Sequence, residues 1–224
     1  MAKAVGSRKR GRRGAEPRRQ PQQERGEKRV EELLDAAEAV IAEVGVAAAT
    51  TNAIAERAGA SVGSLYHFYP NKEALIRGLA ARYTEELGRI KERSLTGQAA
   101  VVPLRDMVDG IVDPFVAFMD ARPAYLAVFH ATADSRHPSC IDEELHLQIV
   151  GLVESLMAAR APATDPGYRR LQATFAVEYV HRMLEAAWGQ TGPLRQGMIE
   201  ELKRLFLLHC EMIQAGRDPL AERL

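Results

Sequence analysis

Two short polar runs within residues 50–72 carry the side chains best suited to binding a polyanion. The first is Thr50-Thr51-Asn52 and the second is Ser61-Val62-Gly63-Ser64, and each opens a stretch of helical pattern. Small and hydroxylated residues in the first turn of a helix let its free N–H groups and positive dipole end approach a phosphate closely. The two runs therefore indicate phosphate contacts at two neighbouring helix starts.

Lys72 opens a further helical stretch, directly after Asn71, which is a good N-cap residue. A cation in the first turn is disfavoured against the helix dipole by roughly 0.3–1 kcal/mol. A phosphate bound beside Lys72 would reverse that penalty, whereas a solvated lysine is the ordinary structural interpretation. Together with the two polar runs, Lys72 favours a surface that faces a polyanion.

Two short helices, residues 51–58 and 62–69, position these polar side chains and meet through a tight turn. Ile54 and Leu65 fall where apolar side chains must pack to fix one helix against the other, and Gly59 stands where the turn needs a positive φ. This is the pattern of a helix-turn-helix, whose second helix enters the major groove of DNA. Such turns also occur in proteins that bind no DNA, so the polar residues decide the interpretation.

The segment TTNAIAERAGASVGSLYHFYPNKEALI is similar to the DNA-binding signature of the TetR family of bacterial transcriptional regulators. The resemblance extends over about residues 29–79, or about a quarter of the chain. It includes the run GASVGSLY and the aromatic pair before NKEAL. Beyond this segment the chain matches the family only in the number and length of its helices.

The resemblance assigns roles within the segment. It implies phosphate contacts from Thr50, Thr51, Ser64, Tyr66 and Lys72, and positions nearest the base edges for Asn52, Val62, Gly63 and His67. Ser61 begins the recognition helix, and Tyr69 either packs on the fourth helix or touches the DNA backbone. Because Val62 and Gly63 offer few hydrogen-bonding groups, we expect sparse direct readout and a larger contribution from DNA shape.

Charge is distributed unevenly along a chain whose formal net charge is zero. Residues 1–29 hold eleven Lys or Arg and three Glu, a charge of +8, so the remaining 195 residues carry −8. A polar basic arm on an acidic body indicates a polyanionic partner, although a solubilising tail has the same composition. The arm has too few apolar residues to offset chain entropy, so we expect disorder over residues 1–26.

Several protein classes are disfavoured. No apolar run approaches the ~18 residues that span a bilayer, and no apolar segment follows the basic N-terminus as a signal peptide requires. Cys140 and Cys210 lack CxxC partners, which indicates a reducing cytoplasm. The histidines form no i, i+4 pair, so no metal site is expected, although a site assembled from His130, His181 and an acid stays open. With no catalytic constellation in the sequence, we expect neither an enzyme nor a cofactor.

Helical periodicity continues to the end of the chain. A first helix is expected from Val30 to Val44, with Gly45 as the C′ residue that ends it. A fourth is expected from about residue 72, and later helices near 104–120, 123–133, 139–160, 165–188 and 194–214. The predicted fold is all-α, with about nine helices. Its expected parts are a disordered basic arm (1–26), a three-helix helix-turn-helix DNA-binding domain (27–80, motif about 50–69), a helical effector-binding and dimerisation domain (81–216) and a C-terminal tail (217–224).

The middle helices combine aromatic and methionine side chains with a few polar groups. Apolar walls with isolated polar groups characterise small-molecule pockets, although a stripe of this kind is more often core. The candidate ligand-binding residues are Phe115, Phe118, Met119, Arg122, Tyr125, Phe129, His130, Phe175, Tyr179, His181, Met183 and Trp188.

The last helix is apolar on all sides of one turn, in the run Leu205-Phe206-Leu207-Leu208. A helix of this kind is buried on both sides, so we expect a homodimer formed through the last two helices, with a central core helix as the alternative. The leading hypothesis is a cytoplasmic, nucleoid-associated homodimeric repressor. It would bind a palindromic operator and be released by a small lipophilic or aromatic effector. The alternatives are an architectural DNA-binding protein without an effector and a helical ligand-binding protein with a vestigial helix-turn-helix.

Overall fold

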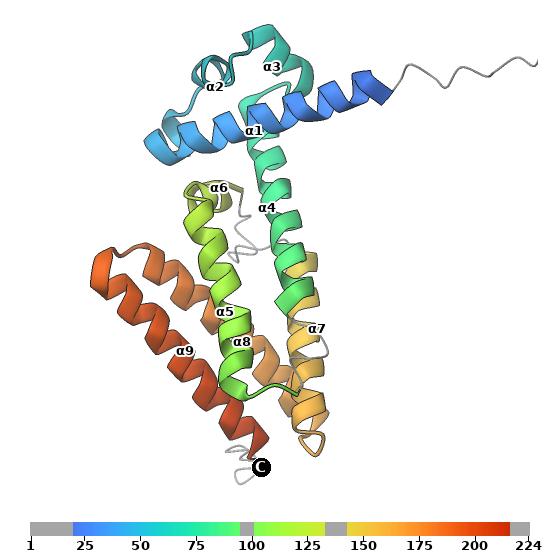
Figure 1. The fold of residues 1–224 in the computed structure, drawn as a ribbon, viewed down its shortest axis with the longest axis vertical. Coiled ribbons are helices and arrows are strands. Elements are labelled where there is room, and N and C mark those ends of the chain that lie inside the picture. Colours follow the sequence, from blue (N-terminus) through green and yellow to red (C-terminus); the bar gives the residue numbers. More distant parts are fainter. Residues whose placement is uncertain (1–19, 95–100, 133–142, 216–224) are drawn as a thin grey trace, which may run out of the picture.

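The computed structural model describes residues 20–94, 101–132 and 143–215, which form nine helices and no strand (Figure 1). The helices are α1 (Gln20–Ala48), α2 (Thr51–Arg57), α3 (Val62–Phe68), α4 (Lys72–Ser94), α5 (Leu104–Ala121), α6 (Tyr125–Thr132), α7 (Glu143–Arg160), α8 (Pro166–Trp188) and α9 (Gly192–Gln214). The all-α prediction is therefore confirmed.

The first helix is longer than the sequence suggested at both ends. It begins at Gln20, so residues 20–26 of the expected disordered arm are helical, whereas residues 1–19 lie outside the described part of the chain. Proline in the first turn costs a helix little, and the Gln, Glu, Lys and Arg residues that follow have high helix propensity. Gly45 does adopt a positive φ of 77°, but it kinks the helix rather than ending it, and one more turn follows.

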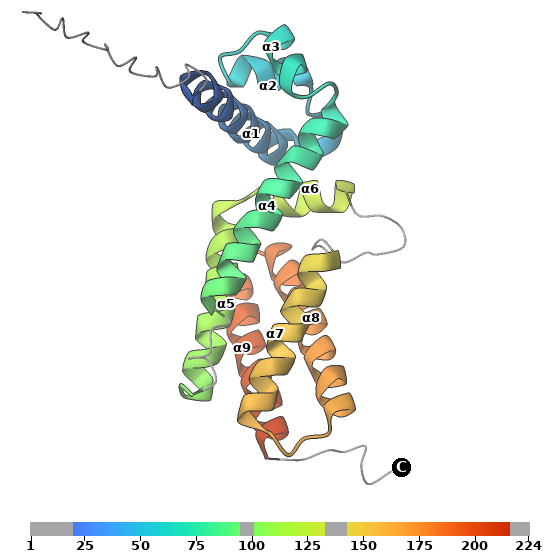
Figure 2. The same ribbon diagram turned by 90° about the vertical axis from the view of Figure 1, so that its right-hand side faces the viewer.

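The helices form a small head on an elongated body (Figures 1 and 2). The head contains α1, α2, α3 and the first turns of α4. From there α4 runs down into the body, where it packs against α5, α6 and α7. α6 lies beneath α1 and contacts both α1 and α4, while α7, α8 and α9 form the rest of the bundle. The long helix α4 is therefore a single rigid element that belongs to both parts.

Fully buried aliphatic side chains hold the head together. Ile54 of α2 and Leu65 of α3 are 1% and 0% exposed, and they join Leu33, Ala37 and Leu79 in one core. Close packing of this kind fixes the angle between α2 and α3, because each buried methyl group removes apolar surface from water.

Tyr69 packs on α4, which is one of the two positions that the sequence left open. A Cβ atom on Gly78 would lie only 2.7 Å from Cε1 of the Tyr69 ring, so the ring lies directly on the backbone of α4. Its half-buried position raises the pKa of Tyr69, with a smaller contribution from the charge of Glu31. The aromatic side chain therefore fastens the end of α3 to α4 in the head.

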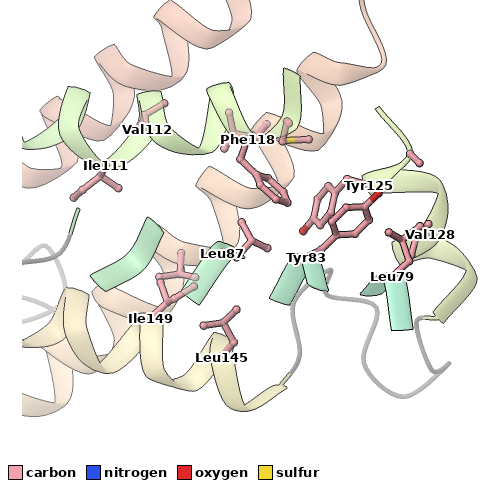
Figure 3. Packing of buried hydrophobic residues seen from close by; sticks show 14 of the residues in the cluster. Leu79, Tyr83, Leu87, Ile111, Val112, Phe118, Tyr125, Val128, Leu145 and Ile149 are labelled. Atoms are coloured by element: carbon pink, nitrogen blue, oxygen red, sulfur yellow. The ribbon is translucent and has the colours of Figure 1, made fainter. Parts of the chain in front are cut away.

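The hydrophobic core continues from the head into the body, where aromatic and aliphatic side chains meet (Figure 3). Figure 3 shows Tyr83 and Leu87 of α4 pointing towards Phe118 of α5 and Tyr125 of α6, and each of these side chains is at least nine-tenths buried. The rings of Tyr83, Phe118 and Tyr125 meet edge to face, with centroids 5.0–6.0 Å apart. Edge-to-face contacts add to area burial because ring edges are positive and ring faces negative. α4 is thus held in the body by the same kind of packing that holds it in the head.

Replacing Leu65 by alanine should destabilise the head by about 2–5 kcal/mol, because the substitution leaves a cavity at a fully buried position. Urea unfolding followed by circular dichroism, at fixed protein concentration, measures the effect. Val44 is 52% exposed, so Val44→Ala is the matched control and should stay within about 0.5 kcal/mol of the parent. Equal losses in the two variants would contradict this account of the core.

Candidate nucleic-acid interface and effector cavity

Side-chain caps and a tight turn define the helix-turn-helix. The Thr50 hydroxyl accepts a hydrogen bond from Ala53 N (3.2 Å) at the start of α2, and the Ser61 hydroxyl accepts one from Ser64 N (3.1 Å) at the start of α3. Between them Gly59 has a φ of 59°, in the region that strongly favours glycine. The hydroxyls of Thr50 and Ser61 thus cap α2 and α3. The sequence predicts phosphate contacts at these same two helix starts.

The predicted DNA-binding residues lie on accessible parts of the head. In Figure 1, α2 and α3 lie at the end of the molecule farthest from the body. Among the ten predicted residues, those with exposed side chains or backbone are Thr50, Asn52, Ser61, Gly63, Tyr66 and His67. Those that are half-buried are Thr51, Val62, Ser64 and Lys72. None is buried, so each stays available to a bound duplex, and its role in DNA binding remains a prediction.

A polar contact connects the two helices on this surface. Thr51 Oγ1 lies 3.2 Å from the hydroxyl of Tyr66, which is 46% exposed. The contact holds the tyrosine ring over the start of α2 while leaving its hydroxyl with further hydrogen-bonding capacity. The two hydroxyls therefore lie together on the surface of the head, and their contact with a phosphate remains a prediction.

Lys72 has a structural partner that the sequence did not reveal. Its Nζ donates to the carbonyl oxygen of Ala47 (3.0 Å), in the last turn of α1. The negative end of the α1 dipole offsets the penalty that the α4 dipole imposes on this cation. An ammonium group has three donors, so two remain for a phosphate.

Few cations support the recognition helix. α3 contains no Lys or Arg. Arg57, at the end of α2, is held by Glu43 of α1 through a two-pronged ion pair of 2.9 and 2.7 Å. The hydrogen bond to Arg57 lowers the pKa of Glu43, so both groups stay ionised. The surface offered to DNA is therefore rich in hydroxyl and N–H groups and poor in charge.

A small cavity lies in the body, between α4, α5, α6 and α8. Its volume is about 20 Å³, which is room for about one water molecule. Five of the candidate ligand-binding residues line it: Phe115, Phe118, Met119, Tyr125 and His181. Four further lining residues escaped the sequence analysis: Leu87, Leu126, Leu184 and Glu185. Glu185 lies one helical turn after His181, and that i, i+4 spacing is the signal that would have found it.

The other candidate ligand-binding residues lie apart from this cavity. Arg122 is occupied by Glu86 and Glu38. Phe175 is 57% exposed on α8, and the Trp188 ring lies 3.7 Å beneath the guanidinium of Arg195. The remaining four, which do not line the cavity, are Phe129, His130, Tyr179 and Met183. Of these residues, Arg122 follows α5 and the others lie on α6 and α8, and their role in effector binding remains a prediction.

His181 is the polar group that distinguishes the cavity wall. Its Nε2 is buried and has no hydrogen-bond partner among the described residues. Burial lowers its pKa to about 4, against smaller opposing contributions from Glu185 and Glu178. The imidazole is therefore neutral at pH 7 and can donate one hydrogen bond and accept another. Glu185 is already held by His130 Nε2 (2.8 Å) and Arg182 Nη1 (2.9 Å).

A second apolar cavity, of about 30 Å³, lies at the far end of the body between α5, α7 and α9. Met107, Met157 and Phe206 line it together with the buried thiol of Cys210, and burial raises the pKa of that thiol to about 12. It contacts no element of the head. Among the described residues, no three or more His, Cys, Asp or Glu side chains gather as metal ligands, and no helix has the length and apolar character needed to cross a membrane.

Comparison with known proteins defines the class of this chain. Residues 33–79 match the family model described as "Bacterial regulatory proteins, tetR family", and residues 103–209 match the one described as "Tetracyclin repressor-like, C-terminal domain". The two matches coincide with the helix-turn-helix head and with the helical body. The fold and its exposed helix-turn-helix are thus those of a DNA-binding transcriptional regulator.

The HTH-type transcriptional repressor KstR2 of Rhodococcus jostii (strain RHA1) is 30% identical over 166 residues, which cover 70% of this chain and 75% of that protein. The chain belongs to the TetR family of bacterial transcriptional regulators, as a DNA-binding repressor.

Solved structures agree with this fold. A TetR-family transcriptional regulator from Streptomyces coelicolor superposes with a TM-score of 0.57 and 24% identity, over 83% of this chain and 99% of that one. A transcriptional regulator from Rhodococcus sp. Rha1 superposes with a TM-score of 0.62 and 19% identity, over 84% and 96%.

The lowered pKa of His181 predicts a loss of stability in acid. The unfolded chain takes up a proton near pH 6.5 whereas the folded chain does so only near pH 4, so the free energy of unfolding falls as the pH drops through this window. The loss approaches about 3 kcal/mol at 1.36 kcal/mol per pH unit. His181→Gln should flatten the dependence in urea unfolding between pH 7 and pH 4.

Burial also lowers the pKa of His209. His209→Gln should therefore flatten the same dependence independently, and the double variant should flatten it further. An unchanged slope in His181→Gln would show that the imidazole is not neutral in the folded chain.

Proposed function

We propose that this repressor binds a palindromic operator as a homodimer and is released by a small lipophilic or aromatic effector that enters the cavity between α4, α5, α6 and α8. The observation that carries the proposal is the continuity of α4. The helix begins at Lys72 in the DNA-binding head and contributes Leu87 to the cavity wall, so one rigid element connects the two sites. The DNA-bound repressor would act in the bacterial cytoplasm, on the chromosomal DNA of the nucleoid.

An exposed apolar stripe supports the homodimer. On α9, Leu194, Leu205, Leu208 and Met212 are 39–59% exposed, and their spacings of 11, 3 and 4 residues place them along one side of the helix. On the neighbouring helix α8, Leu171 and Phe175 are 51% and 57% exposed, one turn apart. Large apolar side chains gathered on one face favour burial against a partner. Two copies related by a twofold axis would bring α8 and α9 of each subunit together in a four-helix interface.

The walls of the cavity support an apolar effector. Leu87, Phe118 and Leu184 are each at least nine-tenths buried, and the polar groups of the wall are few. An effector with an aromatic or aliphatic body and one hydrogen-bonding group fits this lining, because His181 offers a neutral imidazole and the Glu185 carboxylate is already held by His130 and Arg182. The cavity of about 20 Å³ must enlarge to admit any such molecule, and that enlargement would displace the helices around it.

Sequence-specific binding to duplexes selected from a random pool tests the proposed function. Binding no tighter than to random DNA at physiological salt would overturn it in favour of a helical ligand-binding protein with a vestigial helix-turn-helix. Specific binding that no member of a library of apolar compounds weakens would instead support an architectural protein without an effector.

Replacing Leu208 by glutamate should abolish the dimer. The side chain is 43% exposed in the subunit, so the substitution is tolerated in the monomer, but it places a charge within the apolar interface. Sedimentation equilibrium should show a monomer, with operator affinity falling because only one half-site is engaged. Leu147→Glu on α7 is the matched control, since Leu147 is 51% exposed outside the stripe. A dimeric Leu208→Glu protein would rule out this interface.

Lys72→Met should weaken DNA binding about equally on all sequences. Its log–log dependence on salt concentration should be about one unit shallower, because one phosphate contact is lost. Arg89→Met, on the same helix but in the body, is the control and should leave the slope unchanged. An unaltered slope for Lys72→Met would show that the ammonium serves only the Ala47 carbonyl.

A further inference from the structure

Ionised side chains gather where the head meets the body. We call Glu31, Asp35, Glu38, Arg82, Glu86 and Arg122 the Glu38 cluster. Arg82 of α4, whose side chain is 9% exposed, donates to Asp35 Oδ1 (2.6 Å) and to Glu38 Oε2 (2.8 Å) of α1. Burial lowers the pKa of Arg82, but the hydrogen bond to Asp35 and the charges of Asp35 and Glu38 outweigh it, so its pKa is raised overall.

Arg122, in the connection from α5 to α6, completes the cluster from the body. Its Nε and Nη2 donate to the two carboxylate oxygens of Glu86 at 2.9 and 2.7 Å, and its Nη1 donates to Glu38 Oε2 at 3.2 Å. The hydrogen bond to Glu86 raises the pKa of Arg122. A planar guanidinium serves two carboxylates at fixed angles, which an ammonium cannot do. Glu38, also 9% exposed, is thus held by one arginine from α4 and one from the body.

The same residues touch the cavity wall by two routes. Tyr125 N donates to Arg122 O (2.9 Å), so the first turn of α6 ties a cavity-lining ring to Arg122. Tyr83 lies edge-on to Phe118 and to Tyr125, as Figure 3 shows, with centroids 6.0 and 5.6 Å away. Burial, with a smaller contribution from the charge of Glu38, raises the pKa of Tyr83.

We propose that Arg122 couples the cavity to the DNA-binding head: its bonds to Glu38 and Glu86 hold the head in the orientation that binds DNA, and filling the cavity displaces Tyr125 and breaks them. The inference rests on the proposed function and adds the residue through which the regulation acts. A cavity of about 20 Å³ cannot accept an effector unless side chains of its wall move, and Tyr125 is the lining residue that is bonded through its backbone to Arg122. Because Glu38 is buried, water cannot replace Arg122 as its partner when Arg122 withdraws. The ion pair is therefore either made or broken, which gives the junction between head and body two states.

A double-mutant cycle tests this coupling without a known effector. Leu184→Phe enlarges a cavity-lining side chain and imitates an occupied cavity. In the otherwise unchanged protein it should weaken binding to a selected operator duplex by a factor within the 5–150-fold range of allosteric coupling. Arg122→Ala should weaken binding similarly, and adding Leu184→Phe to Arg122→Ala should change affinity less than about twofold. Coupled residues are non-additive, whereas independent ones multiply.

Matched controls keep the result specific. Arg170→Ala removes an exposed arginine that pairs with Glu154 within the body, so Leu184→Phe should keep its full effect in that background. Leu126→Phe fills the same cavity from α6 and replaces Leu184→Phe if that variant does not fold. The proposal would be overturned if Leu184→Phe lowered operator affinity by the same factor in the Arg122→Ala background as in the parent. It would also be overturned if Leu184→Phe or Leu126→Phe filled the cavity without lowering operator affinity.

Hydrogen exchange separates this inference from the proposed function. In the DNA-free protein, Arg122→Ala and Leu184→Phe should each increase amide exchange in α6 and in the middle of α1, and the double variant should add little. If the protein shows no sequence-specific DNA binding, the proposed function fails while this measurement still decides the coupling. If amide exchange in α1 is unchanged in both single variants, Arg122 does not connect the cavity to the head.

Discussion

The structure depends on one constraint: α4 is packed into the hydrophobic core of the head and of the body at once. Its first half lies in the head with Leu75 and Leu79, its second half lies in the body with Tyr83 and Leu87, and one continuous cluster of buried side chains includes all four. A helix of 23 residues is stiff over this length, so a shift of the helix in the body also moves the part that is packed in the head. α1 also packs against α6 of the body, and the ion pairs of the Glu38 cluster add directional contacts to this packing.

Charged groups suit this joint better than further apolar packing. A buried ion pair costs desolvation, so it adds less to stability than leucine in the same space, but its geometry is specific and it breaks completely when one partner leaves. Glu38 is bonded to arginines from two elements, and Arg82 in turn contacts two more exposed carboxylates of α1. The ion pairs of the Glu38 cluster therefore resist rotation of the head relative to the body while Arg122 is bonded to Glu38.

Local sequence predicted the parts whose structure depends on local interactions. The caps at Thr50 and Ser61 and the positive φ at Gly59 are properties of a few neighbouring residues, so the helix-turn-helix was predicted nearly to the residue. The cavity and the Glu38 cluster depend on which faces of distant helices meet. Arg122 appeared to be a pocket residue because its neighbours are apolar, yet its partner Glu38 lies 84 positions earlier in the chain. No periodicity encodes such a contact, and so its role emerged only from the fold.

The composition of the recognition surface explains why the orientation of the head would matter so much. α3 has no Lys or Arg, and Arg57 of α2 is neutralised by Glu43, so these two helices supply no unpaired Lys or Arg to the phosphate attraction that dominates most DNA binding. Two weak heads joined in one dimer bind tightly only if both reach their half-sites together, because the second contact then forms at a high effective concentration. That advantage vanishes when the spacing is wrong. A small rotation at the Glu38 cluster would then change operator affinity more than the loss of any single contact on α2 or α3.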